Sequence, residues 1–350
     1  MDLTVSAFYW YLHESDMTQN ALLEIGVENL PARFVGPALV QLEESVIKRL
    51  VADSLEFKRV KVTGTYKRLI VLIERLEEKS AEQTKEIAGP PVRLLRDEGG
   101  AWTAQSLGFA RSHGVSPEEL VTVKSSKGEF LAVRRTIPGE PAVKLLSKIF
   151  FQAISSLQFP KNMVWESSQF RFARPVRWLT ALYGSRIIPF SVAGVRSGRK
   201  TFGLSCLGSK PVNLAEAGRY LKLLENKCVV ADISERRQLL EKLLDQAGKR
   251  MKLTVDADET LLNETVYLVE HPVPVTGHFS LKFLKLPEEL LCMVLRKQLK
   301  FFPVRGTDGK LQPHFVGVRD GISEGQKEVQ EGYESVVEAR LSDAVFFFER

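Results

Sequence analysis

Basic side chains gather in the middle of the sequence. Between residues 160 and 210, nine lysines and arginines stand against one carboxylate, Glu166, which gives this stretch a charge of +8. The whole 350-residue chain has a formal net charge of only +6, and segment 318–350 is acidic. Such an asymmetry indicates an anionic partner, although a solvated surface is the alternative interpretation. The candidate contacts to that partner are Lys161, Arg171, Arg174, Arg177, Arg199 and Lys200.

Other motifs that could carry chemistry are weaker. Residues 194–201, GVRSGRKT, look like a phosphate-binding P-loop, but only three residues separate the glycines where the amide cradle needs four. His271 and His278 have no further ligand at a telling distance, so we interpret them as ordinary loop histidines and predict no metal site. Glu270 beside His271 is a possible acid–base pair, although adjacent side chains rarely point the same way.

The composition excludes several classes of protein. With 44% apolar and 26% charged residues, the chain is neither disordered, nor collagen-like, nor a disulfide scaffold. Cys206, Cys228 and Cys292 are scattered without a Cys-x-x-Cys pair, which is typical of a reducing cytosol. No run approaches 18 apolar residues, and the apolar run 5–12 makes a poor signal peptide. We therefore expect a cytoplasmic protein that has no membrane segment.

The elements that position these residues follow from apolar spacing. Pro37 and Pro141 each predict the start of an amphipathic helix, and Ile47 and Phe150 are expected in the core. Two β-rich runs, 57–62 and 69–73, predict a hairpin. Asn213 and Asp232 each precede a glutamate by three residues, which is the spacing of a helix capping box.

Domain organisation is predicted at a coarser level. At about 150 residues per domain, the length predicts two or three domains. Helices and strands are interspersed without a regular βαβ rhythm, so an α+β class is favoured. We expect an extension over 1–17, an N-terminal α+β domain over 18–155 and a second α+β domain over 156–350 that ends in a helix.

Seven segments stand in a characteristic order along the chain: ALLEIGVENLPA (21–32), TYKRL (65–69), FPKNMVW (159–165), FARPVRW (172–178), EHPV (270–273), FLKLPEE (283–289) and RLSDAVFFFE (340–349). Together they resemble the β subunit of the bacterial two-subunit glycyl-tRNA synthetase, over about residues 20–350. The last segment is the most specific, and TYKRL matches only loosely. Two further family segments differ here, at 201–207 and 298–302, because the polar residues of the family are missing, and no site is transferred to them.

The resemblance implies the fold and the partners. It implies that the second domain is similar to the editing domain of the phenylalanyl-tRNA synthetase β subunit. It also implies that the chain is an N-terminal half, without the family's His-Asp-type and anticodon-binding domains. The implied partners are the α subunit, in an α2β2 assembly, and tRNA(Gly), with no DNA and no membrane. ATP and Mg²⁺ are expected at the α subunit, and none is expected on this chain.

The resemblance further implies a division of labour. The chain would be a tRNA-binding subunit of glycine–tRNA ligase that has no catalytic residue of its own, while the α subunit attaches glycine to tRNA at the expense of ATP. The six basic candidates would then contact tRNA phosphates, or instead pair with the acidic C-terminal helix. Two alternatives stay open: a stand-alone RNA-binding module, and a trans-editing esterase with Glu270 or His271 as its base. Trp165 and Trp178 are expected in the core, with Val176 on the same strand face as Trp178.

Overall fold

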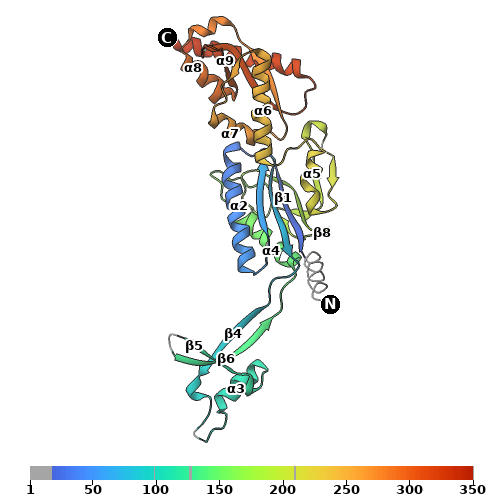
Figure 1. The fold of residues 1–350 in the computed structure, drawn as a ribbon, viewed down its shortest axis with the longest axis vertical. Coiled ribbons are helices and arrows are strands. Elements are labelled where there is room, and N and C mark those ends of the chain that lie inside the picture. The colour runs from blue at the N-terminus through green and yellow to red at the C-terminus, as the bar shows by residue number, and fades with distance from the viewer. Residues whose placement is uncertain (1–17, 98, 126–127, 209, 350) are drawn as a thin grey trace, which may run out of the picture.

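The computed structural model describes residues 18–97, 99–125, 128–208 and 210–349. The chain forms three parts that follow one another along the longest axis of the molecule (Figure 1). A central sheet carries helices on its faces, a small unit extends from one end, and a helix-rich part lies at the other end. This mixture of separate sheets and helices confirms the α+β class. The predicted extension over 1–17 lies outside the described residues.

The central sheet has seven strands in the order β2-β3-β1-β7-β10-β9, and β8 pairs with β7. All its pairings are antiparallel except β10 with β7. The expected boundary at residue 155 falls inside this unit, because β1 pairs with β7 along most of its length. The strands are β1 (Thr18–Val27), β2 (Arg59–Thr65), β3 (Arg68–Glu77), β7 (Val176–Tyr183), β8 (Arg186–Ile187), β9 (Ser191–Val192) and β10 (Val195–Gly198).

Two helices pack against one face of this sheet and bury the main core. They are α2 (Ala32–Ala52) and α4 (Ala142–Ser155), and the hairpin β2–β3 and the helix after Pro141 confirm the sequence predictions. The first helix begins before Pro37, which lies inside it, so the predicted start was wrong by about one turn. Phe150 is fully buried, whereas Ile47 is only half-buried at the margin of the core.

The opposite face of the sheet packs against a smaller layer, which comprises β11 (Lys200–Phe202), a 3₁₀ turn (Ser205–Leu207), β12 (Pro211–Asn213), a second 3₁₀ turn (Ala217–Arg219) and α5 (Tyr220–Glu225). Asn213 ends a strand and does not cap a helix, so that capping prediction was wrong. Asp232, in contrast, accepts hydrogen bonds from the amides of Ser234 and Glu235 at the start of the next helix, as predicted.

A bulge at the end of β1 decides which way one tryptophan points. Gly26 pairs with Trp178 and Val27 pairs with Val176, so Arg177 is an extra residue on β7. Val176 therefore faces the main core, while Trp178 lies on the other face beside Arg68. The prediction that both share a face was wrong, because a shift of one residue exchanges the two faces of a strand.

Both predicted core tryptophans are half-buried. Trp165 packs against the main core. The indole of Trp178 lies across Gly26, where a Cβ atom would come within 1.9 Å of the ring, and its ring centre is 4.8 Å from that of Phe202. Glycine is thus required at position 26 for this packing.

The small unit is inserted between β3 and α4, and extends away from the central sheet on a two-stranded ribbon (Figure 1). Its three-stranded sheet has the order β4-β6-β5, with α3 beside it. Its elements are β4 (Gln83–Pro91), a 3₁₀ turn (Val92–Leu94), α3 (Ala104–His113), a 3₁₀ turn (Pro117–Glu119), β5 (Val121–Ser125) and β6 (Gly128–Ile137).

The C-terminal part is built around a four-stranded sheet, whose strands have the order β13-β15-β16-β14. Its helices are α6 (Ile233–Met251), α7 (Glu259–Leu268), a 3₁₀ helix (Leu281–Lys285), α8 (Glu288–Met293), a π-helix (Val294–Leu299) and α9 (Gln326–Phe348). Its strands are β13 (Thr254–Val255), β14 (Pro272–His278), β15 (Phe302–Arg305) and β16 (Leu311–Asp320). In the described part of the chain, no helix is long and apolar enough to cross a membrane.

Candidate nucleic-acid interface

The six basic candidates form two groups along the chain. Lys161, Arg171 and Arg174 lie between the end of α4 and the beginning of β7, and Arg177 is the second residue of β7. Arg199 and Lys200 lie where β10 leads into β11. Arg199 and Lys200 are held beside β7, since β10 pairs with that strand and the Thr180 hydroxyl oxygen lies 2.6 Å from the carbonyl oxygen of Lys200.

Three of the candidates are the most available for a phosphate. Lys161, Arg171 and Lys200 are exposed, and their side chains form no ion pair with any residue that the structure describes. Arg177 is also exposed and has a loose ion pair with Glu28, with 3.4 Å between Nη1 and Oε1. An exposed pair of this kind contributes roughly 0–1 kcal/mol, so it is easily exchanged for another anion.

Arg199 has a structural role in the folded chain. Its guanidinium donates to the carbonyl oxygens of Ser185 at 3.0 Å and Leu214 at 3.3 Å, and to that of Ala215 at 3.4 Å. It thereby holds the turn after β7 against the segment after β12. Arg174 is half-buried and donates to the carbonyl of Ala173 at 2.9 Å. These two side chains are less free to bind an external phosphate.

The acidic residues of α9 pair with neighbours in the C-terminal part. Glu334 is 2.7 Å from Nδ1 of His278, and Glu338 is 2.7 Å from Nζ of Lys282. Across the described ranges, no ion pair joins α9 to any of the six candidates, so the alternative that this helix neutralises them is wrong.

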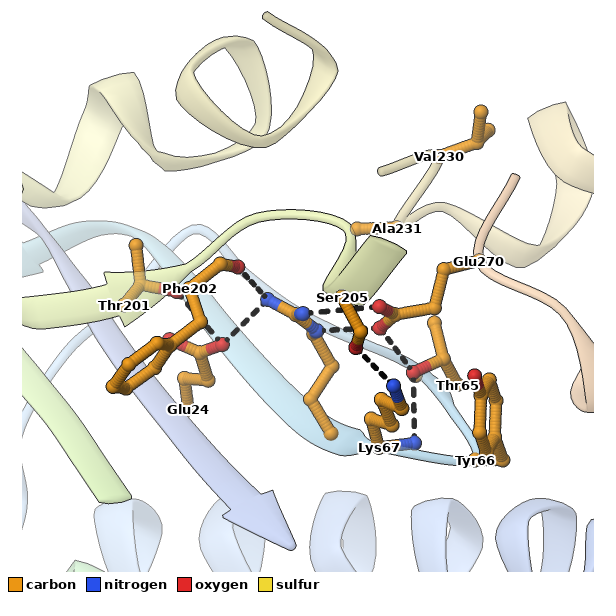
Figure 2. Close-up of polar contacts among 12 residues, drawn as sticks. Glu24, Thr65, Tyr66, Lys67, Thr201, Phe202, Ser205, Val230, Ala231 and Glu270 are labelled. Carbon is orange, nitrogen blue, oxygen red and sulfur yellow. Dashed lines mark hydrogen bonds and ion pairs between the residues drawn. The ribbon is translucent and has the colours of Figure 1, made fainter. Parts of the chain in front are cut away.

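A buried ion network lies beneath this region, and sequence reasoning missed it. Arg68, 1% exposed, stands between two fully buried carboxylates. Its Nη1 is 2.9 Å from Glu24, and its Nε is 2.7 Å from Glu270 (Figure 2). In the sequence, Arg68 is 44 residues from Glu24 and 202 residues from Glu270. The signal that could have found it is Glu24 within the otherwise apolar run 21–27, since a buried carboxylate requires a partner.

Hydroxyl and carbonyl groups complete the network. Thr180 and Thr201 each donate to Glu24 at 2.9 Å, and Thr65 donates to Glu270 at 2.7 Å. Arg68 also donates to the carbonyl of Phe202 at 2.9 Å. Burial by itself would lower the pKa of the Arg68 guanidinium, but the two carboxylates outweigh it and hold the pKa above its ordinary value. The Arg68 guanidinium therefore remains charged in the interior.

The same network connects the central sheet to the C-terminal part. The hydroxyl of Tyr66, in the turn of the β2–β3 hairpin, is 2.5 Å from Asp320 at the end of β16. Asp320 also accepts from the amides of Glu270 and His271 at 2.8 Å. Burial, and next the charge of Asp320, raise the pKa of Tyr66, so its hydroxyl remains a donor.

The first helix of the C-terminal part is attached to the same hairpin. Arg236, in α6, is fully buried and donates to the carbonyl oxygens of Gly64 at 2.6 Å and Val266 at 2.8 Å. Lys61 pairs with Asp232 at 2.5 Å. Together with the Arg68 network, these contacts form the joint between the two parts, defined by Glu24, Lys61, Tyr66, Arg68, Asp232, Arg236, Glu270 and Asp320.

Glu270 and His271 do not form an acid–base pair. The carboxylate of Glu270 is directed into the joint, while Nδ1 of His271 is 2.7 Å from the carbonyl of Gly321. His278 lies at the far end of β14 and contacts Glu334. The described residues contain no group of three or more histidine, cysteine, aspartate or glutamate side chains that could hold a metal ion.

Comparison with known proteins identifies a family along nearly the whole chain. Residues 21–350 match the family described as Glycyl-tRNA synthetase beta subunit. The sequence is 38% identical over 333 residues to the glycine–tRNA ligase beta subunit of Moorella thermoacetica, which covers 95% of this chain and 48% of that protein. The beta subunit from Bacillus subtilis is 37% identical over 331 residues, 94% of this chain and 48% of its own length. The chain spans about half the length of these curated relatives, and it belongs to the glycyl-tRNA synthetase β subunit family.

Proposed function

We propose that this chain is a tRNA-binding, non-catalytic part of a glycine–tRNA ligase β subunit. It supports the ATP-dependent attachment of glycine to tRNA(Gly) by an α subunit, in an α2β2 assembly in the cytoplasm. ATP and Mg²⁺ are bound by the α subunit. Family membership over residues 21–350 supports the reaction, because the relatives carry the name of that ligase.

The observation that carries the tRNA-binding role is the set of exposed cations without an intramolecular partner. Lys161, Arg171 and Lys200 are exposed to solvent and unpaired among the described residues. Lysine and arginine side chains in this state bind phosphates and release the counterions of a nucleic acid. Such contacts position the RNA without reading its sequence, so the affinity of this chain differs little between tRNAs.

The finer division of the chain belongs to the same proposal. Residues 156–350 have the fold of the phenylalanyl-tRNA synthetase editing domain, and their strands β7–β10 complete the sheet that 18–155 begins. Shared fold does not bring a shared activity. The trans-editing alternative requires a free base, whereas Glu270 is fully buried and engaged by Arg68 and Thr65, and Nδ1 of His271 is 2.7 Å from the carbonyl oxygen of Gly321. The geometry therefore favours tRNA binding over ester hydrolysis.

The first experiment measures tRNA binding as a function of salt. We expect the triple variant Lys161→Ala/Arg171→Ala/Lys200→Ala to bind every tRNA more weakly. The slope of log affinity against log salt falls by up to about 0.9 for each phosphate contact removed. Arg199 is left intact because its substitution would disturb the fold.

The control variant changes three exposed lysines that lie elsewhere, Lys222, Lys249 and Lys310, to alanine. It carries the same change in net charge and should retain the salt slope of the wild type. If both triple variants bind tRNA with the same affinity and slope, the interface is not at the proposed residues.

The second experiment tests the division of labour. Glycine-dependent exchange between ATP and pyrophosphate should be undetectable with this chain alone and should require an α subunit. Exchange by the isolated chain would contradict the non-catalytic role.

A further inference from the structure

The end of α9 exposes a run of large apolar side chains. Phe346 is 50% exposed, Phe347 78% and Phe348 55%, and Met293 beside them is 41% exposed. Most of α9 is polar on its outer side, and only Val337 and Leu341 are fully buried. Three consecutive exposed phenylalanines are costly in water and are characteristic of a contact surface.

Hollows lie on both sides of this helix end. One, of about 460 Å³, lies between α8, the π-helix and α9, and is lined by Leu290, Met293, Ala344 and Phe347. The other, of about 370 Å³, lies on the side of the 3₁₀ helix and is lined by Leu286, Val345 and Phe348. The helix end is therefore a ridge between two grooves, and its apolar surface continues into both.

The size of this surface distinguishes between possible occupants. A phenylalanine buries roughly 200 Å² when covered, so the exposed fractions of the three side chains leave about 350–400 Å² to cover. Together with the partner surface that covers them, the three phenylalanines account for about 700–800 Å², less than the roughly 1,200 Å² of a stable complex between separate proteins. It lies within the roughly 600–1,500 Å² that is usual between domains of one chain.

The position of the apolar surface in the chain indicates which polypeptide covers it. The match to the family extends to residue 350, and it covers the N-terminal half of relatives that are about twice as long. In those relatives the other half of the polypeptide starts next to the position of this ridge. A short tether gives an effective concentration in the millimolar range, so a small interface suffices.

We propose that the apolar end of α9 is a docking surface for the polypeptide that corresponds to the C-terminal half of these relatives. Phe347 and Phe348 insert into that partner, and segments of the partner occupy the two grooves beside α9. This contact is separate from the basic residues of the candidate tRNA interface, and it fixes how the two halves of a β subunit are oriented.

The test uses a chimera in which this chain replaces the matched half of the Moorella thermoacetica relative. Amide hydrogen exchange over residues 341–349 is compared between the chimera and the 350-residue chain. We expect exchange at least tenfold slower in the chimera, because covered helix ends open less often. The variant Phe347→Ser/Phe348→Ser should abolish this protection, while circular dichroism shows that the fold is retained.

A matched control changes two exposed valines of α2, Val40→Ser/Val51→Ser, which are 55% and 65% exposed. This variant should keep the full protection at 341–349. Equal exchange in the chimera and the 350-residue chain would overturn the proposal. Sedimentation of the 350-residue chain supplies a second measurement, in which a dimer that dissociates on Phe347→Ser/Phe348→Ser identifies a second copy as the occupant and also overturns it. Since tRNA affinity is not measured in either experiment, the result is independent of the proposed function.

Discussion

Removal of the Arg68 guanidinium is the most demanding test of the joint. The substitution Arg68→Met keeps a long, flexible apolar side chain in the same space and removes the charge. Glu24 and Glu270, both fully buried, then lose their common partner. The carbonyl of Phe202 loses a donor as well.

The expected cost follows from the burial of these groups. Breaking a buried ion pair by removing one partner costs about 3–5 kcal/mol, because an uncompensated charge stays in the interior. Here two carboxylates are affected, while Thr65, Thr180 and Thr201 still donate to them. We therefore expect Arg68→Met to lower the free energy of unfolding by about 3–5 kcal/mol. Arg68→Lys should also destabilise, since an ammonium group does not reproduce the fork geometry that reaches both carboxylates.

The assay is urea denaturation at pH 7, followed by circular dichroism. The control is Lys222→Met, which removes an exposed ion pair with Glu225 and should change the free energy of unfolding by less than about 1 kcal/mol. The triple variant Arg68→Met/Glu24→Gln/Glu270→Gln should recover part of the loss, because no charge then remains buried without a partner. A loss below about 1 kcal/mol for Arg68→Met, or no recovery in the triple variant, would refute the reasoning.

Three further predictions concern stability. Gly26→Ala would place a Cβ atom in the ring of Trp178, so it should cost about 1–3 kcal/mol in denaturation and shift the tryptophan emission; unchanged emission would contradict this packing. Phe150→Ala should lower the free energy of unfolding by about 3–5 kcal/mol, and Ile47→Ala by roughly half as much because Ile47 is only half-buried. Equal losses would show that Ile47 belongs to the core as fully as Phe150 does. Burial would raise the pKa of Asp232, but Lys61 and two backbone amides outweigh it and hold the pKa below its usual value. This carboxylate therefore stabilises the fold above about pH 4, and the contribution is lost as the pH falls through the lowered pKa. In Asp232→Asn, the urea midpoint should be lower at pH 6 and should fall less between pH 6 and pH 3 than in the wild type.

Local signals in the sequence determined the hairpin β2–β3 and the starts of two helices, α4 and α6. Pro141 and the apolar spacing that follows it fix the start and the buried face of α4, and Asp232 caps α6 as its spacing predicts. These features depend on neighbours within one or two turns, so they can be read without the fold. The ordered segments likewise identified the family from residue types alone.

The sequence predicted the candidate interface only in part. The sequence supplied the excess of cations over 160–210, because charge is a property of composition. It did not show that Arg199 is engaged by three carbonyl groups while Lys200, next to it, is exposed. Whether a cation is available depends on which distant carbonyl or carboxylate lies within reach.

Only the tertiary structure decided the features that depend on long-range pairing. The bulge at Arg177 moves Trp178 to the opposite face of the sheet, since side chains alternate with a period of two and one extra residue reverses them. The pairing of β1 with β7 unites residues on both sides of position 155 in one sheet. Arg68 meets Glu270 across 202 residues because the hairpin turn and the start of β14 converge at the joint. The sequence contains these charged residues, but the cost of burying a charge selects its partner only after the chain has folded.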